Sequence, residues 1–269
     1  VVLNVTPFHA EGGGQVGDTG RMICTMGNVQ VITTRMLPAG TVYHLGIVTE
    51  GSLKTNELVQ LEVDVKRRNA VARNHTATHL LHAALKRVLG NHVNQAGSLV
   101  NSDRLRFDFS HFAAVTAEQL SEIENMVNNV ILENANVGII ETTQDMAKAM
   151  GATALFGEKY GDQVRVIMVN DFSTELCGGT HVSKTSEIGF LRIISEGGIG
   201  AGLRRIEAVT GFSAIDYVKS RDKILADSAS ALKSRPDDVT TRIDSLLTRV
   251  KELEREVEKL SAKVAKAAV

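Results

Sequence analysis

The chain has 269 residues, 43% of them hydrophobic, and a formal net charge of −1. This length is sufficient for one large or two ordinary domains with buried cores. The near-neutral charge excludes a protein that coats nucleic acid through bulk electrostatics. Cys24 and Cys177 are too few for a disulfide scaffold. Without a membrane-spanning apolar run or a signal peptide, the chain is expected to be cytoplasmic with no membrane partner, and its start at Val1 suggests a segment of a longer protein.

Residues 1–66 are predicted to form a β-domain. Every second residue from Val59 to Val65 is apolar, as in a strand with one buried face. A tight turn is expected at residues 26–28. Three earlier runs are also typical of strands: residues 21–26, 29–35 and 41–48. Several short strands at this spacing predict a small barrel.

A glycine-rich segment, Gly12-Gly-Gly-Gln-Val-Gly17, interrupts this β-domain. Its spacing satisfies the G-x-G-x-x-G pattern of dinucleotide-binding loops, but that fingerprint also requires a helix that opens at the third glycine. Here turn residues and further strands follow, so nucleotide binding is not expected. The glycines instead predict a loop with positive φ angles.

Residues 67–212 are predicted to mix helices and strands in an α+β domain with a mostly antiparallel sheet. The first helix runs from Arg67 to Leu89, and Gly90 ends it. Thr116 caps a second helix that extends to about residue 135. A short helix is expected at 145–150, and strands are expected at 104–110, 164–169 and 190–195.

Two pairs of metal-ligand residue types occur in this domain. His75 and His79 are four residues apart on the predicted helix, so both imidazoles lie on one face. Cys177 and His181 follow a predicted strand, and the two glycines between them are expected to let the backbone fold tightly. Three nitrogens and one sulfur are typical of tetrahedral zinc. The sequence therefore predicts Zn²⁺ bound by His75, His79, Cys177 and His181.

Other interpretations apply to the residues around these pairs. Two histidines alone on an apolar helix are more often packed than metal-bound. His82 extends the same face and is expected to support the site or the core, because four ligands already fill it. Thr76 argues against a zincin peptidase, whose motif requires Glu at that place. Thr78 follows His75 by three residues, which places its hydroxyl beside the metal-binding face; a surface threonine is the alternative.

The C-terminal part of the chain is predicted to be helical. Residues 213–232 form one helix, and Pro236 begins another. From Val239 to Ala267, apolar residues recur at alternating spacings of four and three, the a/d pattern of a coiled coil. This seam can pair with the preceding helix of the same chain or with a second copy in a homodimer.

Three further motifs accompany the zinc pairs: Thr6-Pro-Phe-His-Ala-Glu11, Gly157-Glu-Lys-Tyr160 and Arg204-Arg-Ile-Glu-Ala208. Together with His75-Thr-Ala-Thr-His79 and Cys177-Gly-Gly-Thr-His181, they resemble the editing domain of bacterial-type alanyl-tRNA synthetases. The resemblance runs from residue 1 to about residue 212. The family usually shows Tyr and Ser where this chain has His9 and Gly12.

The resemblance implies three regions. Residues 1–66 would be a β-barrel subdomain whose glycine-rich loop lies beside the editing pocket. Residues 67–212 would be a zinc-dependent α+β editing domain of the threonyl/alanyl-tRNA synthetase type. Residues 213–269 would be helices with coiled-coil heptads that lead to a C-terminal domain absent from this sequence.

The resemblance also implies an activity, which is post-transfer editing by a zinc-dependent deacylase. Its substrate would be alanine tRNA mischarged with serine or glycine, and its reaction would be hydrolysis of the aminoacyl ester. Cys177 would be a displaceable zinc ligand, Gln95 and Thr78 would contact the aminoacyl group, and Arg204 would contact the pocket or the tRNA unless it forms a surface salt bridge. Two alternatives remain, a non-catalytic tRNA-binding module with structural zinc and a free-standing editing protein.

Overall fold

The computed structural model describes residues 1–153 and 161–267, and these residues form two compact units, Val1–Ala214 and Ile215–Val269. The sequence motif Gly157–Tyr160 lies outside the described residues. No described helix is long and apolar enough to cross a membrane.

The N-terminal part of the first unit is an antiparallel sheet. Its strands are β1 (Gly20–Cys24), β2 (Gly27–Met36), β3 (Val42–Gly51) and β4 (Gln60–Val63). They are arranged in the order β3-β2-β1-β4. Residues Thr25 and Met26 form the turn between β1 and β2, because Cys24 pairs with Gly27. The predicted turn at 26–28 therefore lies one residue too late.

This sheet is open, so the predicted barrel is wrong. Closure of a barrel requires hydrogen bonds between the two edge strands. Here β3 and β4 are the edges, and within the described residues they are not neighbours. A small cluster on one face of the sheet, formed by Phe8, Met22, Val29 and Val31, is buried. One buried face gives the same alternation in an open sheet as in a barrel, which is why the pattern predicted strands correctly and closure incorrectly.

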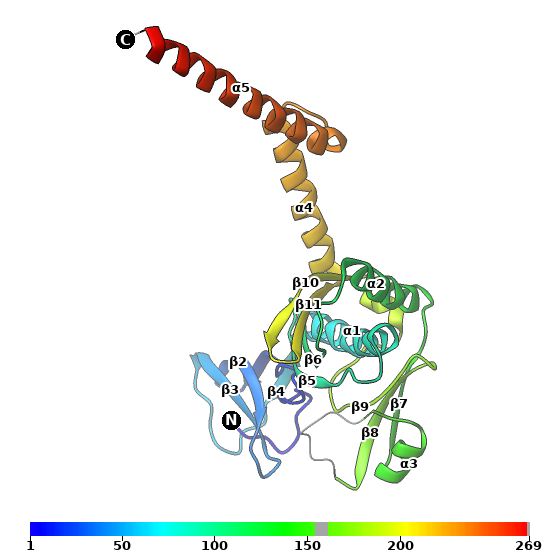
Figure 1. Cartoon of the computed structure of the whole chain (residues 1–269). Helices are drawn as coiled ribbons and strands as arrows, with labels where there is room; N and C mark the ends of the chain where they lie inside the picture. The colour runs from blue at the N-terminus through cyan, green and yellow to red at the C-terminus, as the bar shows by residue number, and fades with distance from the viewer. Residues whose placement is uncertain (154–160, 268–269) are drawn as a thin grey trace. The chain divides into compact units, whose positions relative to one another are not determined.

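The rest of the first unit is built around α1 (Val65–Leu89), the helix predicted at 67–89. The Asp64 carboxylate accepts a hydrogen bond from the Arg67 amide at its start, and Gly90 ends it with a positive φ of 115°. From Val71 to Leu85 nearly every side chain is buried. The helix lies in the middle of the unit, in contact with strands on one side and with another helix on the other (Figure 1).

Within the described residues, two antiparallel sheets, two further α-helices and one 3₁₀ turn complete the α+β region. One sheet has the order β10-β11-β6-β5, and the other has the order β7-β8-β9. The strands are β5 (Gln95–Val100), β6 (Leu105–Ser110), β7 (Val137–Thr143), β8 (Gln163–Val169), β9 (Ser173–Leu176), β10 (Leu191–Gly200) and β11 (Leu203–Thr210). The helices are α2 (Ala117–Leu132), α3 (Gln144–Ala149) and the 3₁₀ turn η1 (Thr185–Ile188).

The core of this region lies between α1, α2 and the β10-β11-β6-β5 sheet. Leu81 of α1, Phe107 of β6, Val127 of α2 and Ile206 of β11 belong to one buried cluster. The predicted cap of α2 is confirmed, because Thr116 and Gln119 form a reciprocal capping box. The burial of α1 between these layers fixes the orientation of its histidine face.

The C-terminal unit is helical, as predicted. It contains most of α4 (Gly211–Ala231), the 3₁₀ turn η2 (Pro236–Asp238) and α5 (Val239–Ala267). The apolar seam of α5 from Ile243 to Val264 is between 40% and 69% exposed, so α4 does not cover it. Pairing of the seam within the chain is therefore absent from the described residues.

Candidate metal centre

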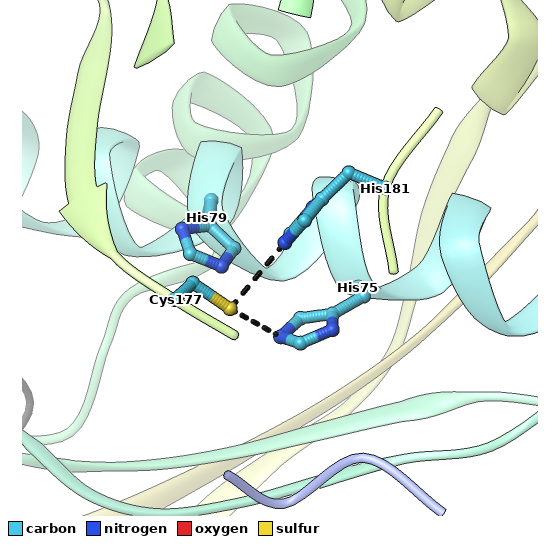
Figure 2. A group of neighbouring side chains, drawn as sticks. All are labelled: His75, His79, Cys177 and His181. Atoms are coloured by element: carbon cyan, nitrogen blue, oxygen red, sulfur yellow. Dashed lines mark hydrogen bonds between the residues drawn. The ribbon is translucent and has the colours of Figure 1, made fainter. Parts of the chain in front are cut away.

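Four side chains from two distant segments converge at one point of the first unit. His75 and His79 project from α1, while Cys177 and His181 lie in the loop after β9 (Figure 2). The four candidate ligand atoms all lie within 4.8 Å of one another. The Cys177 Sγ atom is 3.4 Å from His75 Nε2 and 3.3 Å from His181 Nε2. His75, His79 and Cys177 are buried, and His181 is half-buried.

The loop after β9 is held by backbone hydrogen bonds to β8. The Cys177 amide donates to the Arg165 carbonyl at 2.9 Å. In return, the Arg165 Nη1 donates to the carbonyls of Cys177 and Gly179, at 2.9 and 2.6 Å. One guanidinium thus satisfies two carbonyls of the loop, which fixes its path beside α1.

The two glycines of this loop differ in their surroundings. A Cβ atom built on Gly179 would lie 2.1 Å from Cε1 and 2.3 Å from Nδ1 of His75. A Cβ on Gly178 would meet nothing within 4 Å. Neither glycine has a positive φ angle. Gly179 is therefore needed for close approach to His75.

Contacts at Nδ1 orient the three imidazoles. The Nδ1 of His75 lies 2.6 Å from the Gln15 Oε1, and the Nδ1 of His79 forms an ion-pair contact of 2.8 Å with the Glu175 Oε2. The Nδ1 of His181 lies 3.1 Å from the Thr76 hydroxyl.

The Thr76 hydroxyl donates its own proton to the Ala72 carbonyl, so it must accept from His181. Each Nδ1 thus faces a protein oxygen, which leaves each Nε2 for the centre of the cluster.

The ionisable groups of the cluster strongly perturb one another. Burial raises the pKa of the Cys177 thiol, but the charge of His75 and hydrogen bonds from the imidazoles outweigh it and hold that pKa well below its ordinary value. Burial lowers the pKa of His79, yet the Glu175 carboxylate and Cys177 raise it to about 10. Burial and the charge of His75 lower the pKa of His181 to about 3. Without metal, the cluster therefore holds a thiolate next to a protonated His79.

The donor set and its spacing fit zinc. A tetrahedral ion with bonds of about 2.1 Å to nitrogen and about 2.3 Å to sulfur holds its ligand atoms roughly 3.5 Å apart. The sulfur–nitrogen distances of 3.4 and 3.3 Å match this value. Zinc requires a thiolate and neutral imidazoles, so it would bind the Cys177 thiolate and displace the proton of His79. His75, His79, Cys177 and His181 could therefore hold the ion.

The remaining predicted site residues have other surroundings. The Thr78 hydroxyl donates to the Asn74 carbonyl at 2.8 Å. Gln95 is the first residue of β5, and its side-chain amide makes no hydrogen bond within the described residues. Arg204 of β11 forms an ion pair with Glu196, and its Nη2 donates to the Glu196 Oε2 at 2.8 Å. The structure thus brings the four metal-ligand candidates into mutual contact, while these three side chains have no described contact with them.

Two family models match parts of the chain. The model described as threonyl and alanyl tRNA synthetase second additional domain matches residues 164–207. The model described as tRNA synthetases class II (A) matches residues 1–67.

Curated relatives match more of the chain. The alanine–tRNA ligase of Desulfitobacterium hafniense is 52% identical over 269 residues, which is 100% of this chain and 31% of the relative. Those of Acetivibrio thermocellus and Bacillus cereus are each 52% identical over 243 residues, 90% of this chain and 28% of the relative. The chain belongs to the alanyl-tRNA synthetase family. It spans less than a third of the length of these three relatives.

The segment that matches the additional domain of alanyl and threonyl tRNA synthetases contains half of the cluster. Cys177 and His181 lie inside residues 164–207, whereas His75 and His79 lie between the two matched segments. Gln15 lies inside the other matched segment, residues 1–67. The cluster is thus assembled across segments that are far apart in sequence.

Sequence reasoning missed three residues that support the ligands. The sequence pattern places Gln15 only in a glycine-rich loop, gives Glu175 no role, and marks Thr76 only as a mismatch to a peptidase motif. Glu175 contacts His79, and it also lies 2.9 Å from the Nδ1 of His82. One available signal is the acidic residue two positions before Cys177. The sequence gives no comparable signal for Gln15 or Thr76. Their partners are distant in sequence, or can be placed only from an exact helix geometry.

Proposed function

We propose that this chain carries the post-transfer editing activity of an alanyl-tRNA synthetase. The reaction would be hydrolysis of the aminoacyl ester of alanine tRNA mischarged with serine or glycine. The observation that carries the proposal is the convergence of three imidazoles and one thiolate within 4.8 Å, in a chain whose relatives are alanine–tRNA ligases. The partner would be the alanine tRNA, and the cofactor would be Zn²⁺.

The need for such an activity follows from the size of the amino acids. A pocket for alanine cannot reject glycine strongly, because one missing methylene changes binding by only about 1–3 kcal/mol. An added hydroxyl, as in serine, is also poorly rejected by an apolar pocket. A second, hydrolytic site corrects both errors after the ester has formed.

The proposed substrate-contacting residues suit a small polar substrate. Zinc, when bound, would supply Lewis acidity for a water or for the ester carbonyl. The Thr78 hydroxyl uses its proton on Asn74, so its lone pairs would accept from a serine hydroxyl or an ammonium group. The amide of Gln95 has no hydrogen-bond partner within the described residues and would contact the aminoacyl group or the terminal ribose. Cys177 would be the ligand that yields its place.

Arg204 is the weakest of the proposed site residues. Its Nε and Nη2 atoms are used by Glu196, which supports the salt-bridge interpretation of this residue. The remaining Nη1 donors would contact a phosphate of the tRNA. The proposed role of Arg204 is therefore tRNA contact rather than recognition of the amino acid.

Deacylation assays test this function. We expect the protein to release serine from mischarged alanine tRNA and to leave correctly charged alanyl-tRNA intact. Cys177→Ala should abolish the release, because it removes the sulfur from the cluster. Cys24→Ala is the matched control, since Cys24 lies in β1 outside the cluster, and it should retain activity. A folded Cys177→Ala variant with normal activity would contradict the assignment.

A second candidate function has one observation in its favour. Zinc bound by four protein ligands is typical of structural sites, whereas catalytic sites keep one position open. The chain would then be a tRNA-binding module that leaves the ester untouched. Chelation distinguishes the two, because loss of structural zinc should unfold the first unit in circular dichroism, whereas loss of catalytic zinc should stop deacylation and leave the spectrum unchanged.

A further inference from the structure

The side chain of Gln15 reaches the metal centre from outside the α+β region. Gln15 precedes β1, and its side chain is buried. Its Oε1 lies 2.6 Å from His75 Nδ1 and accepts from the Thr180 amide at 2.8 Å. Its Nε2 donates to the Thr180 hydroxyl at 2.9 Å. We propose that Gln15 is a positioning residue that sets the tautomer and orientation of the zinc ligand His75. The proposal rests on zinc binding, which is part of the proposed function.

The hydrogen bonds fix the protonation of His75 without ambiguity. A backbone amide can only donate, so the side-chain atom that faces the Thr180 amide must be the oxygen of Gln15. That oxygen can only accept, so His75 must carry its proton on Nδ1. In the neutral imidazole that binds a metal, Nε2 is then the nitrogen without a proton, and it faces the Cys177 sulfur at 3.4 Å. This is the tautomer that allows Nε2 to bind a metal ion.

The backbone around Gln15 is rigid enough for this role. Gly12 and Gln15 exchange two backbone hydrogen bonds across a tight turn, of 3.1 and 2.9 Å. Gly13 and Gly14 occupy the turn with positive φ angles of 57° and 82°. The turn is joined to β5, because the Val100 amide donates to the Gly14 carbonyl at 2.8 Å. The glycine-rich segment therefore holds one amide against one imidazole.

The turn is also anchored to α1 itself. Asp18 pairs with Arg68 of α1, whose Nε donates to the Asp18 Oδ2 at 3.0 Å. The Arg67 Nη1 donates to the Gly17 carbonyl at 2.8 Å. These contacts fix the glycine-rich segment to the same helix that carries His75. Gln15 and His75 are thus both held by α1, as precise placement of a metal ligand requires.

Three glutamine variants test the assignment. Gln15→Leu keeps the volume but leaves the His75 and Thr180 N–H groups without an acceptor, whereas Gln15→Glu restores an acceptor for both. Gln30→Leu is the control, because Gln30 is an exposed glutamine of β2, outside the cluster, whose side chain bonds the Gly20 carbonyl at 2.9 Å. Zinc affinity is measured by chelator competition, and geometry is measured by the absorption spectrum of the Co²⁺-loaded protein. Circular dichroism reports the fold.

We expect Gln15→Leu to weaken zinc binding by about 10–100-fold and to alter the cobalt spectrum. Gln15→Glu and Gln30→Leu should behave like the unaltered protein. A folded Gln15→Leu variant with unchanged zinc affinity and cobalt spectrum would overturn the proposal, as would failure of Gln15→Glu to restore them. If Gln15→Leu does not fold, NMR of the zinc-loaded unaltered protein decides, since His75 bound through Nδ1 would contradict the assignment and His75 bound through Nε2 would support it.

The outcome is separable from that of the proposed function. Zinc binding that depends on Gln15, without deacylation of seryl-tRNA, would contradict only the editing activity. Deacylation that persists while Gln15→Leu leaves zinc binding unchanged would contradict only the role of Gln15. Absence of zinc binding by the unaltered protein would contradict the role of Gln15, and the deacylation assay would still judge the activity.

Discussion

Contact between Gly179 and His75 is the tightest constraint on a single residue of the metal centre. The Cα of Gly179 lies where any side chain would overlap the imidazole ring. A Cβ at Gly179 would also lie 2.7 Å from the Gln15 Oε1, which contacts the His75 Nδ1 at 2.6 Å. The loop itself is held in place, since Arg165 binds the Gly179 carbonyl at 2.6 Å.

The first prediction at this scale concerns the two adjacent glycines. Gly179→Ala should weaken zinc binding by at least tenfold, because the new methyl displaces His75 from its bond to the metal. Gly178→Ala should have little effect, since a Cβ there meets no atom within 4 Å. Chelator competition measures both variants. Equal zinc affinities for the two would show that the loop adapts and would contradict the role given to Gly179.

The second prediction concerns the proton on His79. The pKa of metal-free His79 is raised to about 10, above the ordinary histidine value of 6.5, so at pH 7 the imidazole is protonated. The thiol of Cys177 is already ionised at that pH. Zinc must therefore displace about one proton, and zinc affinity should rise by up to roughly tenfold per pH unit between pH 7 and about pH 10.

Calorimetry in buffers of different ionisation enthalpy measures this proton release. Glu175→Gln removes the carboxylate that raises the His79 pKa, while burial, which lowers it, remains. The variant should release less of a proton per zinc ion at pH 7. Proton release that is zero in the unaltered protein, or unchanged in Glu175→Gln, would contradict this account of the cluster.

Individual residues of the site also differ in how well the sequence predicts them. The ligand set follows from local spacing, because four residues on a helix return to the same face and a short loop brings Cys177 near His181. Gln15 could not be found in this way. Its contact with His75 spans 60 residues and depends on how the N-terminal sheet packs against α1.

At the scale of elements, local sequence signals predict where a helix or strand begins and ends better than they predict how these elements pack together. The ends of α1 follow from Asp64 and Gly90, which act through neighbouring backbone groups. The capping box of α2 is local for the same reason. The open N-terminal sheet was mistaken for a barrel because closure depends on contacts between strands that are distant in sequence. Alternating polarity does not contain that information.

The prediction at the scale of elements concerns α5. Its apolar seam from Ile243 to Val264 is at least 40% exposed, although apolar residues at a/d spacing normally pack against another helix. We expect the chain to form a dimer through this seam at micromolar concentration. Val250→Glu combined with Leu253→Glu should yield a monomer in sedimentation equilibrium.

A matched control for α5 is Arg255→Glu, which changes an exposed residue outside the seam and should preserve the dimer. A monomeric unaltered protein at all concentrations would contradict the prediction. Dimerisation that survives the double seam substitution would assign the interface to another surface.

At the scale of the whole molecule, the first unit is united by contacts to α1. The glycine-rich segment, the β5 edge and the loop after β9 all meet near its histidine face. The sequence predicted most of these elements one by one. It could not predict that a turn set aside as a false nucleotide-binding motif would lie against a metal ligand, because that depends on packing between regions.

The long interval between the two halves of the cluster has a consequence for protein synthesis. His75 and Cys177 are 102 residues apart, so at about 5–20 residues per second the ribosome makes them roughly 5–20 s apart. During that interval α1 emerges without the thiolate and the third imidazole that complete its site. A metal ion can therefore be bound by all four ligands only after the ribosome has translated His181.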